Sequence, residues 1–242
     1  MNTQTEDPVE IASKSDSDTS AVVVFLHNKG GLTFDIVNTT RSKSAVLEHV
    51  KWILPPAPVI PVTIRMQAET RAWFDVRTSE SMADPAPEKE DEARILQSMA
   101  TIDALLTKIV ASGVDPSRIV LGGFSQGGAI ALLTGLSTSR KLAGLIVLSA
   151  RLPLRHQFRS MVSSHASSIP IFWGHGTADT AVSYELGRAA ADYLVNEIGV
   201  PPAPYPGAPE GLDFHTYDGL PHYISDEELT DLASWLGTIL PQ

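Results

Sequence analysis

A single serine, Ser125, stands among four glycines in the stretch VLGGFSQGGAIALL, residues 120–133. Residues 123–127 read Gly-Phe-Ser-Gln-Gly and fit the pattern G-x-S-x-G. Where this pattern joins a strand to a helix, the serine lies on a sharp turn with its hydroxyl exposed, and a Cβ at the glycines would collide with its neighbours. The dipole of the following helix favours negative charge beside the serine. We therefore interpret Ser125 as a nucleophile, with a glycine-rich packing turn as the alternative.

A serine hydroxyl is a weak nucleophile and needs a general base, which in turn needs an acid to orient it. In this strand–turn–helix arrangement the partners follow the serine in the order acid, then histidine. Asp179 follows a strand-like apolar stretch and His222 precedes the last expected helix, so we predict a triad of Ser125, Asp179 and His222. Asp213 and Asp218, which flank the last expected strand, stay open as alternatives for the acid. The candidates ranked lower lie in or at the ends of strands, or in a helix: His27, His175, which is expected to support its loop, His215 and Asp192.

Acyl transfer also needs hydrogen-bond donors for the negative oxygen that forms when a carbonyl is attacked. One donor is expected to be the backbone N–H of Gln126, directly after the nucleophile, and the other an N–H from the loop after an early strand. The stretch HNKGG, residues 27–31, is that loop, and Lys29 is our candidate for the second donor through its backbone. The alternative is an ordinary glycine turn.

The elements that must position these residues are strands that alternate with helices. Strands are predicted at 21–27, 50–54, 118–123, 142–150, 169–176 and 213–219. Helices are predicted from apolar spacing, glycine stops and a capping box at 88–112, 127–136, 184–197 and 225–240. Continuous apolar runs in the strands predict a mostly parallel sheet with helices on both faces. Residues 1–20 are predicted to be a mobile tail before one domain of residues 21–242, in which residues 62–87 are irregular.

Composition excludes several classes of function. The 18 basic and 28 acidic residues give a formal charge of −10, which repels nucleic acid and anionic bilayers, so neither is an expected partner. The sequence has no cysteine, which excludes a cysteine nucleophile, a disulfide framework and a thiolate metal site. Its polar beginning lacks the features of a secretory signal and no apolar run is long enough to span a bilayer. We therefore expect a cytoplasmic protein without stable membrane insertion.

Eight stretches match, in order, the landmarks of a known family: VVVFLH, VKWILPPAPVIPVT, RAWFDV, EDEARILQSMATIDALL, IVLGGFSQGGAIAL, LAGLIVLSARLP, WGHGTAD and YDGLPH. On these stretches, from about residue 21 to its end, the sequence resembles the acyl-protein thioesterases and related small carboxylesterases, which have the α/β-hydrolase fold. The resemblance implies that Ser125, Asp179 and His222 form the triad and that Gln126 is an oxyanion donor. It also implies hydrolysis of thioesters and esters with medium to long acyl chains, including palmitoyl groups on protein cysteines, without a metal or an organic cofactor.

Two loops depart from the family's pattern. The family usually has histidine, glycine, leucine, glycine and aspartate where this chain has HNKGG, and a histidine where this chain has Pro56. Both loops border the expected acyl entrance, where a change alters substrate preference. The candidates for lining an apolar acyl groove, with core packing as the alternative, are Leu152, Pro153, Trp73 and Phe74. The alternative functions are a small-molecule carboxylesterase or lysophospholipase with the same triad, and a non-catalytic binding protein with a degenerate hydrolase pocket.

Overall fold

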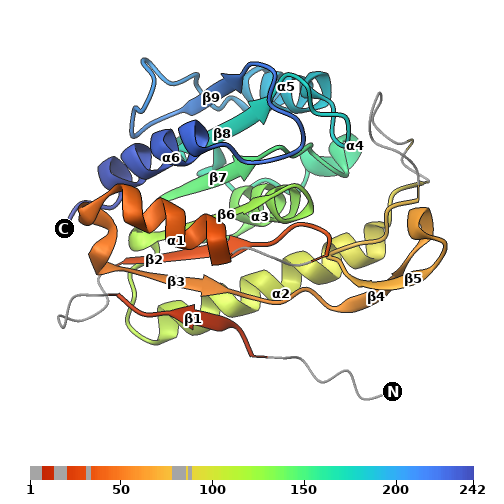
Figure 1. Cartoon of the computed structure of the whole chain (residues 1–242), viewed down its shortest axis with the longest axis horizontal. Helices are drawn as coiled ribbons and strands as arrows, with labels where there is room; N and C mark the ends of the chain where they lie inside the picture. Colours follow the sequence, from red (N-terminus) through yellow and green to blue (C-terminus); the bar gives the residue numbers. More distant parts are fainter. Residues whose placement is uncertain (1–6, 14–20, 31–33, 78–85, 87–88) are drawn as a thin grey trace.

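The computed structural model describes residues 7–13, 21–30, 34–77, 86 and 89–242 (Figure 1). The described residues form a seven-stranded sheet in the order β1-β3-β2-β6-β7-β8-β9. All neighbouring strands from β3 to β9 are parallel, and β1 pairs antiparallel with β3. This arrangement confirms the predicted mostly parallel sheet. The strands are β1 (Val9–Ile11), β2 (Ala21–Leu26), β3 (Val50–Leu54), β6 (Ile119–Phe124), β7 (Gly144–Leu148), β8 (Ile171–Gly176) and β9 (Leu212–Tyr217).

Helices cover both faces of this sheet. Helices α1 and α6 contact each other on one face and pack on one hydrophobic cluster, whereas α2, α3 and α5 pack on a second cluster (Figure 1). Among the described residues, no helix is both long enough and apolar enough to cross a bilayer. The helices are α1 (Phe34–Lys43), α2 (Glu92–Ala111), α3 (Gln126–Ser137), α4 (Arg155–Phe158), α5 (Tyr184–Tyr193) and α6 (Asp226–Ile239), with short helical turns η1 (Ala45–His49), η2 (Thr63–Arg65), η4 (Pro116–Arg118), η5 (Ala166–Ser168) and η6 (Leu194–Ile198).

Strand β2 shows why the central strands read as continuous apolar runs. All six of its residues are buried. Val22, Val24 and Leu26 belong to the cluster under α2 and α3. The alternating residues Val23 and Phe25 belong to the cluster under α1 and α6. Because successive side chains of a strand point to opposite faces, a sheet that is covered twice requires apolar residues at every position.

Three short or polar elements differ from the sequence-based expectation. Within the predicted tail of residues 1–20, strand β1 pairs with β3, and Glu10 forms an ion pair of 2.7 Å with Lys51. Within the segment of residues 62–87, expected to be irregular, β5 (Ala68–Arg71) pairs antiparallel with β4 (Val59–Val62), which lies directly before that segment. Helix α1 has few apolar residues and was not predicted. The tail prediction is therefore wrong at β1 and the irregular-segment prediction is wrong at β5, because backbone pairing with a neighbouring strand orders segments that have no apolar run of their own.

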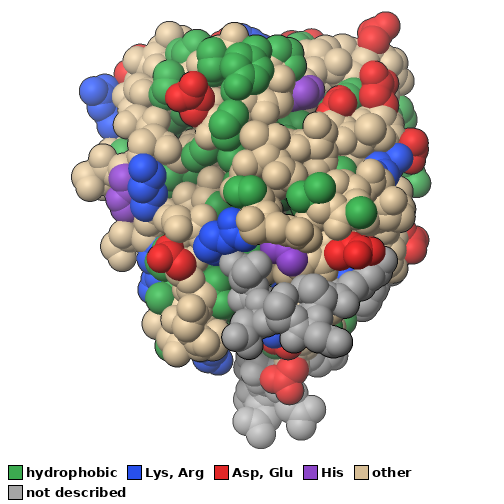
Figure 2. Space-filling model, turned by 90° about the vertical axis from the view of Figure 1, so that its left-hand side faces the viewer, with side chains coloured by type: hydrophobic (Ala, Val, Ile, Leu, Met, Phe, Trp, Pro, Cys, Tyr) green, Lys and Arg blue, Asp and Glu red, His purple; other side chains and the backbone are tan. Residues whose placement is uncertain are grey.

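The sheet gives the molecule two different ends. Figure 2 shows the end where the parallel strands begin, with charged side chains of both signs scattered among neutral ones and apolar side chains gathered near the top of the view. The loops that follow the parallel strands lie at the other end, on the right of Figure 1. In an open α/β sheet ligands bind outside the carboxyl ends of the strands, so the site is expected at that second end.

Candidate active site

Ser125 lies on the turn between β6 and α3 with φ 57° and ψ −121°. Such angles cost a non-glycine residue about 1–3 kcal/mol and persist only where the surroundings enforce them. The Ser125 N–H donates to the Leu148 carbonyl oxygen at 2.8 Å, and its own carbonyl accepts from the Ala129 N–H at 3.0 Å. A Cβ on Gly123 would overlap the backbone of Gly127, and a Cβ on Gly127 would overlap the carbonyl oxygen of Leu26. The glycines around Ser125 are therefore required by the close approach of backbones at this turn.

The structure brings Ser125, His222 and Asp179 together in one line of hydrogen bonds. His222 Nε2 lies 3.0 Å from Ser125 Oγ, and His222 Nδ1 lies 2.7 Å from Asp179 Oδ2. The His222 ring stacks on Phe124, with ring centroids 4.8 Å apart and an interplanar angle of 29°. The three residues follow β6, β8 and β9, so the parallel sheet delivers all of them to the same edge.

Asp179 is a buried carboxylate that is surrounded by donors. Its Oδ1 accepts from the N–H groups of Ala181 and Val182, both at 2.9 Å. Its Oδ2 faces His222 and, at 3.5 Å, Nε2 of the buried His175. Burial alone would raise the pKa of Asp179, but the hydrogen bonds from His175 and His222 and the charge of His222 hold this pKa far below its ordinary value. Asp179 is therefore ionised and can stabilise positive charge on His222.

In the described residues, the other acids and histidines weighed from the sequence bond groups other than His222. His175 Nε2 lies 3.0 Å from the Val182 carbonyl oxygen, so this ring supports the loop that carries Asp179. Asp213 Oδ2 instead bonds His215 Nε2 at 2.8 Å. Asp218 instead accepts from the Thr177 hydroxyl at 2.9 Å. Of the acids considered from the sequence, the structure thus brings Asp179 to His222.

On the other side of Ser125, Gln126 occupies the first position of α3. The first N–H groups of a helix have no acceptor within the helix, so the Gln126 N–H is directed out of the helix end beside Ser125. Its side chain turns to a different segment: Oε1 accepts from the Trp73 N–H at 3.1 Å, and Nε2 donates to the Phe74 carbonyl at 2.9 Å. The backbone and the side chain of Gln126 therefore face different partners.

The predicted HNKGG loop follows β2, and its described part is held by its neighbours. Lys29 is half-buried, and the Gly30 N–H donates to the Arg71 carbonyl at 2.9 Å. The His27 ring bonds the Asn28 carbonyl through Nδ1 at 2.6 Å and accepts from the Ala57 N–H through Nε2 at 2.9 Å. Burial lowers the pKa of His27, which agrees with a neutral ring that donates through one nitrogen and accepts through the other. Gly31 lies outside the described residues.

The four residues predicted to line an acyl groove are buried in the structure. Leu152, Trp73 and Phe74 are 1–3% exposed and belong to the larger hydrophobic cluster. Pro153 is buried beside them in sequence. Their positions match the alternative of core packing. The indole N–H of Trp73 also donates to the His27 carbonyl at 2.8 Å, a contact that no sequence pattern signalled.

Comparisons with known proteins cover almost the whole chain. A family model described as Phospholipase/Carboxylesterase matches residues 7–240, a range that includes β1. The acyl-protein thioesterase 1 of Cryptococcus neoformans is 41% identical over 90% of this chain and 91% of that protein. The crystal structure of Arabidopsis thaliana SOBER1 has a TM-score of 0.78 and 30% identity, covering 91% of this chain and 99% of that one. The crystal structure of Zea mays acyl-protein thioesterase 2 has a TM-score of 0.72 and 26% identity, covering 96% and 98% of the two chains. These likenesses confirm the predicted α/β-hydrolase fold.

Proposed function

The chain belongs to the phospholipase/carboxylesterase family of hydrolases, and we propose that it cleaves acyl thioesters on proteins with a triad of Ser125, His222 and Asp179. The observation that carries this proposal is the unbroken line of hydrogen bonds from Ser125 Oγ through His222 to Asp179, at 3.0 and 2.7 Å. The substrate class is supported by relatives that bear the name acyl-protein thioesterase and match nine-tenths of the chain.

In the first step His222 Nε2 takes the proton of the Ser125 hydroxyl while Oγ attacks the acyl carbonyl carbon. The carbonyl oxygen becomes an oxyanion, and Asp179 stabilises the positive charge on His222. The tetrahedral intermediate then collapses: the carbon–sulfur bond breaks, the leaving sulfur takes the proton from His222, and the acyl group stays on Ser125 as an ester. A thiolate has a conjugate-acid pKa of about 8.5, so it leaves more readily than an alkoxide.

The second step repeats this chemistry with water. His222 takes a proton from a water molecule, whose oxygen attacks the ester carbonyl on Ser125. Collapse of the second intermediate breaks the bond to Ser125 Oγ, which recovers its proton from His222, and releases the fatty acid. For the oxyanions of both steps we assign the backbone N–H groups of Gln126 and Lys29 as donors.

We also propose a cytoplasmic location, with acylated proteins as the partners in catalysis. The absence of cysteine supports this location, because a chain without disulfides needs no oxidising compartment to fold.

A second candidate function is hydrolysis of small oxygen esters with the same triad. It is favoured by the HNKGG loop and Pro56, which depart from the family's usual residues beside the expected acyl entrance. Both reactions use the same two steps, and only the leaving group and the length of the acyl chain separate them.

The test is a matched panel of thioesters and oxygen esters with short, medium and palmitoyl-length chains, given to the wild type and to Ser125→Ala. We expect the wild type to cleave the long thioesters fastest and the variant to be inactive. Preference for short oxygen esters would replace the first candidate with the second. Activity that survives Ser125→Ala would contradict both.

A further inference from the structure

Trp73 differs from the other tryptophans in what its indole N–H contacts. All four tryptophans of the chain are fully buried. In the part of the chain that the structure describes, the indole N–H groups of Trp52, Trp173 and Trp235 have no hydrogen-bond partner. The indole N–H of Trp73 donates to the His27 carbonyl at 2.8 Å, and the centroids of the Trp73 and His27 rings are 5.3 Å apart. Its indole therefore forms a specific link to the loop that follows β2.

This link fixes the direction of backbone groups in the loop. A trans peptide is planar, with its C=O and N–H pointing in opposite directions. The His27 carbonyl points to Trp73, and the Asn28 carbonyl points to His27 Nδ1 at 2.6 Å. The Lys29 N–H, which shares a peptide plane with the Asn28 carbonyl, therefore points away from the His27 ring. The His27 ring thus orients the peptide that carries the proposed second oxyanion donor, and Trp73 holds the peptide before it, which joins His27 to Asn28.

The backbone of the same tryptophan holds the first donor residue. The Trp73 N–H donates to Gln126 Oε1 at 3.1 Å, and Gln126 Nε2 donates to the next carbonyl, that of Phe74, at 2.9 Å. Both polar atoms of the Gln126 amide are thus used, and the start of α3 is tied to residues 73 and 74. One residue therefore connects the two segments that carry the proposed oxyanion donors.

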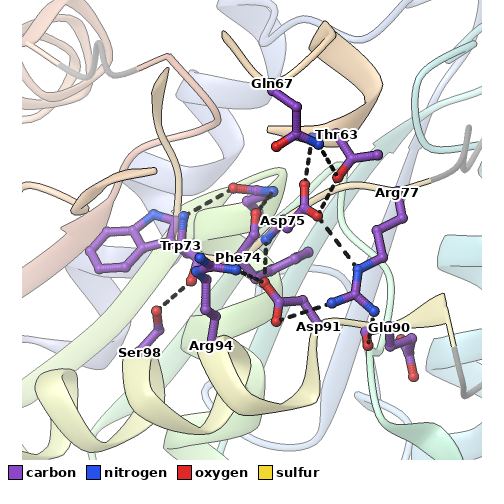
Figure 3. A network of polar contacts seen from close by, with 11 residues as sticks. Thr63, Gln67, Trp73, Phe74, Asp75, Arg77, Glu90, Asp91, Arg94 and Ser98 are labelled. Atoms are coloured by element: carbon purple, nitrogen blue, oxygen red, sulfur yellow. Dashed lines mark hydrogen bonds and ion pairs between the residues drawn. The ribbon is translucent and has the colours of Figure 1, made fainter. Parts of the chain in front are cut away.

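Trp73 is itself anchored to α2 (Figure 3). Ser98 Oγ donates to the Trp73 carbonyl at 2.5 Å. Two residues later, the Asp75 N–H donates to Asp91 Oδ2 at 2.9 Å, and the Asp75 carboxylate accepts from the N–H and hydroxyl of Thr63 at 2.7 and 2.6 Å. Residues 73–75 are thus held at successive positions against the start of α2 and against the hairpin of β4 and β5.

We infer that Trp73 is a positioning residue that keeps the N–H groups of Lys29 and Gln126 aimed at one point, where the acyl oxyanion forms. This inference rests on the proposed function. It assigns to Trp73 an effect on the transition state rather than on binding of the substrate, since the oxyanion exists only after attack.

The test compares Trp73→Phe with Trp52→Phe in the full chain. Each variant keeps a buried aromatic ring, but only the first removes an indole N–H that makes a hydrogen bond. For Trp73→Phe we expect kcat to fall at least about tenfold while KM changes by less than about twofold. A small misplacement of the donors weakens their hydrogen bonds to the oxyanion and so reduces the stabilisation of the transition state. We also expect a trifluoromethyl ketone, which forms a tetrahedral adduct with the serine, to bind at least about tenfold more weakly. Trp52→Phe should match the wild type in both measurements.

Thermal unfolding of both variants separates positioning from a general loss of structure. Where Trp73→Phe does not fold, Gln126→Met serves instead, because it keeps the backbone N–H and the length of the side chain but loses both side-chain hydrogen bonds. Equal loss of kcat in the two tryptophan variants, or a rise in KM at unchanged kcat, would overturn the inference. A wild type that forms the adduct but prefers oxygen esters would overturn the proposed substrate and leave the inference supported by the adduct measurement. A wild type without turnover or adduct would overturn both.

Discussion

The groups on the two sides of Ser125 differ in kind: side-chain atoms lie on one side, and the proposed backbone donors lie on the other. On one side, His222 and Asp179 contribute side-chain atoms in a line of two hydrogen bonds. On the other side, the proposed donors are backbone N–H groups, whose directions depend on contacts from separate segments that include His27 and Trp73. A side chain brings its chemistry with its residue type, whereas every non-proline residue has an N–H and only its orientation makes it useful. The chemistry of the first side can therefore be read from residue types, whereas the orientation of the N–H groups on the second side cannot.

The two sides also differ in what places them. The residues of the triad follow β6, β8 and β9, so the order of strands in a parallel sheet is sufficient to bring them to one edge. The loop after β2 needs further support from the Ala57 N–H and from Trp73. We expect substitutions on the triad side to remove a catalytic side-chain group, and substitutions on the oxyanion side to change the orientation of the N–H donors.

The largest effect is expected from Asp179→Asn. An amide cannot stabilise the charged His222 and favours the wrong tautomer of its ring, which lowers kcat by about 10⁴-fold in comparable triads. The measurement is kcat on the best substrate, with Asp213→Asn as the control because Asp213 bonds His215 instead. A similar loss in both variants would contradict the assignment of the acid.

A smaller loss is expected from His27→Leu on the oxyanion side. The change removes the bonds to the Asn28 carbonyl and the Ala57 N–H, so kcat should fall by roughly 10- to 100-fold with little change in KM. His49→Leu is a matched control, because His49 is equally buried and its Nδ1 lies 2.6 Å from the Val46 carbonyl oxygen, far along the chain from the loop. If His49→Leu lost as much kcat, the effect would reflect general stability.

A pH-dependent effect on stability is expected at Glu228, in the helix that follows the His222 loop. Burial raises the pKa of Glu228 to about 8 from an ordinary value of 4.5, and in the described residues neither carboxyl oxygen has a hydrogen-bond partner. Between these two pH values the folded protein holds a proton that the unfolded chain has lost, so this group lowers stability as pH rises through the window. Glu228→Gln stays neutral. The free energy of unfolding of Glu228→Gln minus that of the wild type should therefore increase, by on the order of a few kcal/mol, from the acid to the alkaline end of the window.

Urea unfolding at the two ends of that window measures the difference. A difference between the two proteins that does not change with pH would show that folding does not raise the pKa of Glu228. The activity of Glu228→Gln at neutral pH should stay close to that of the wild type, since the carboxyl is separate from the line of hydrogen bonds at Ser125.

The smallest effect is expected from Ser98→Ala, one step further from the oxyanion. Ser98 supports the Trp73 carbonyl, so its loss should lower kcat only by a few-fold, about the effect of one buried hydrogen bond of about 1 kcal/mol. Combined with Trp73→Phe, the loss should be less than the product of the two single losses, because both changes weaken the same contact path. Full additivity in this double-mutant cycle would contradict a shared path.

The sequence predicted the parallel sheet and the positions of Ser125, Asp179 and His222 because strand order and residue type carry that information. It did not predict β1, the β4–β5 hairpin or α1, whose order comes from pairing and packing partners that are distant in sequence. Trp73 shows the same limit at one residue. Its apolar ring suggested an acyl groove, whereas its buried position and its bonds to His27 and Gln126 depend on how three segments meet.

The two outer strands of the sheet bear on aggregation. An exposed strand edge offers unpaired N–H and C=O groups to a second molecule. At one edge this sheet ends in β1, which has only three residues. One of them, Glu10, forms an ion pair with Lys51 of β3. At the other edge, Leu212 of β9 forms a backbone bridge with Pro202, which belongs to the proline-rich segment 201–206. Proline has no N–H to donate to a further strand. A sheet whose centre is apolar on both faces is thereby a poor template for fibrous assembly, which suits an enzyme proposed to work among exposed fatty acyl chains.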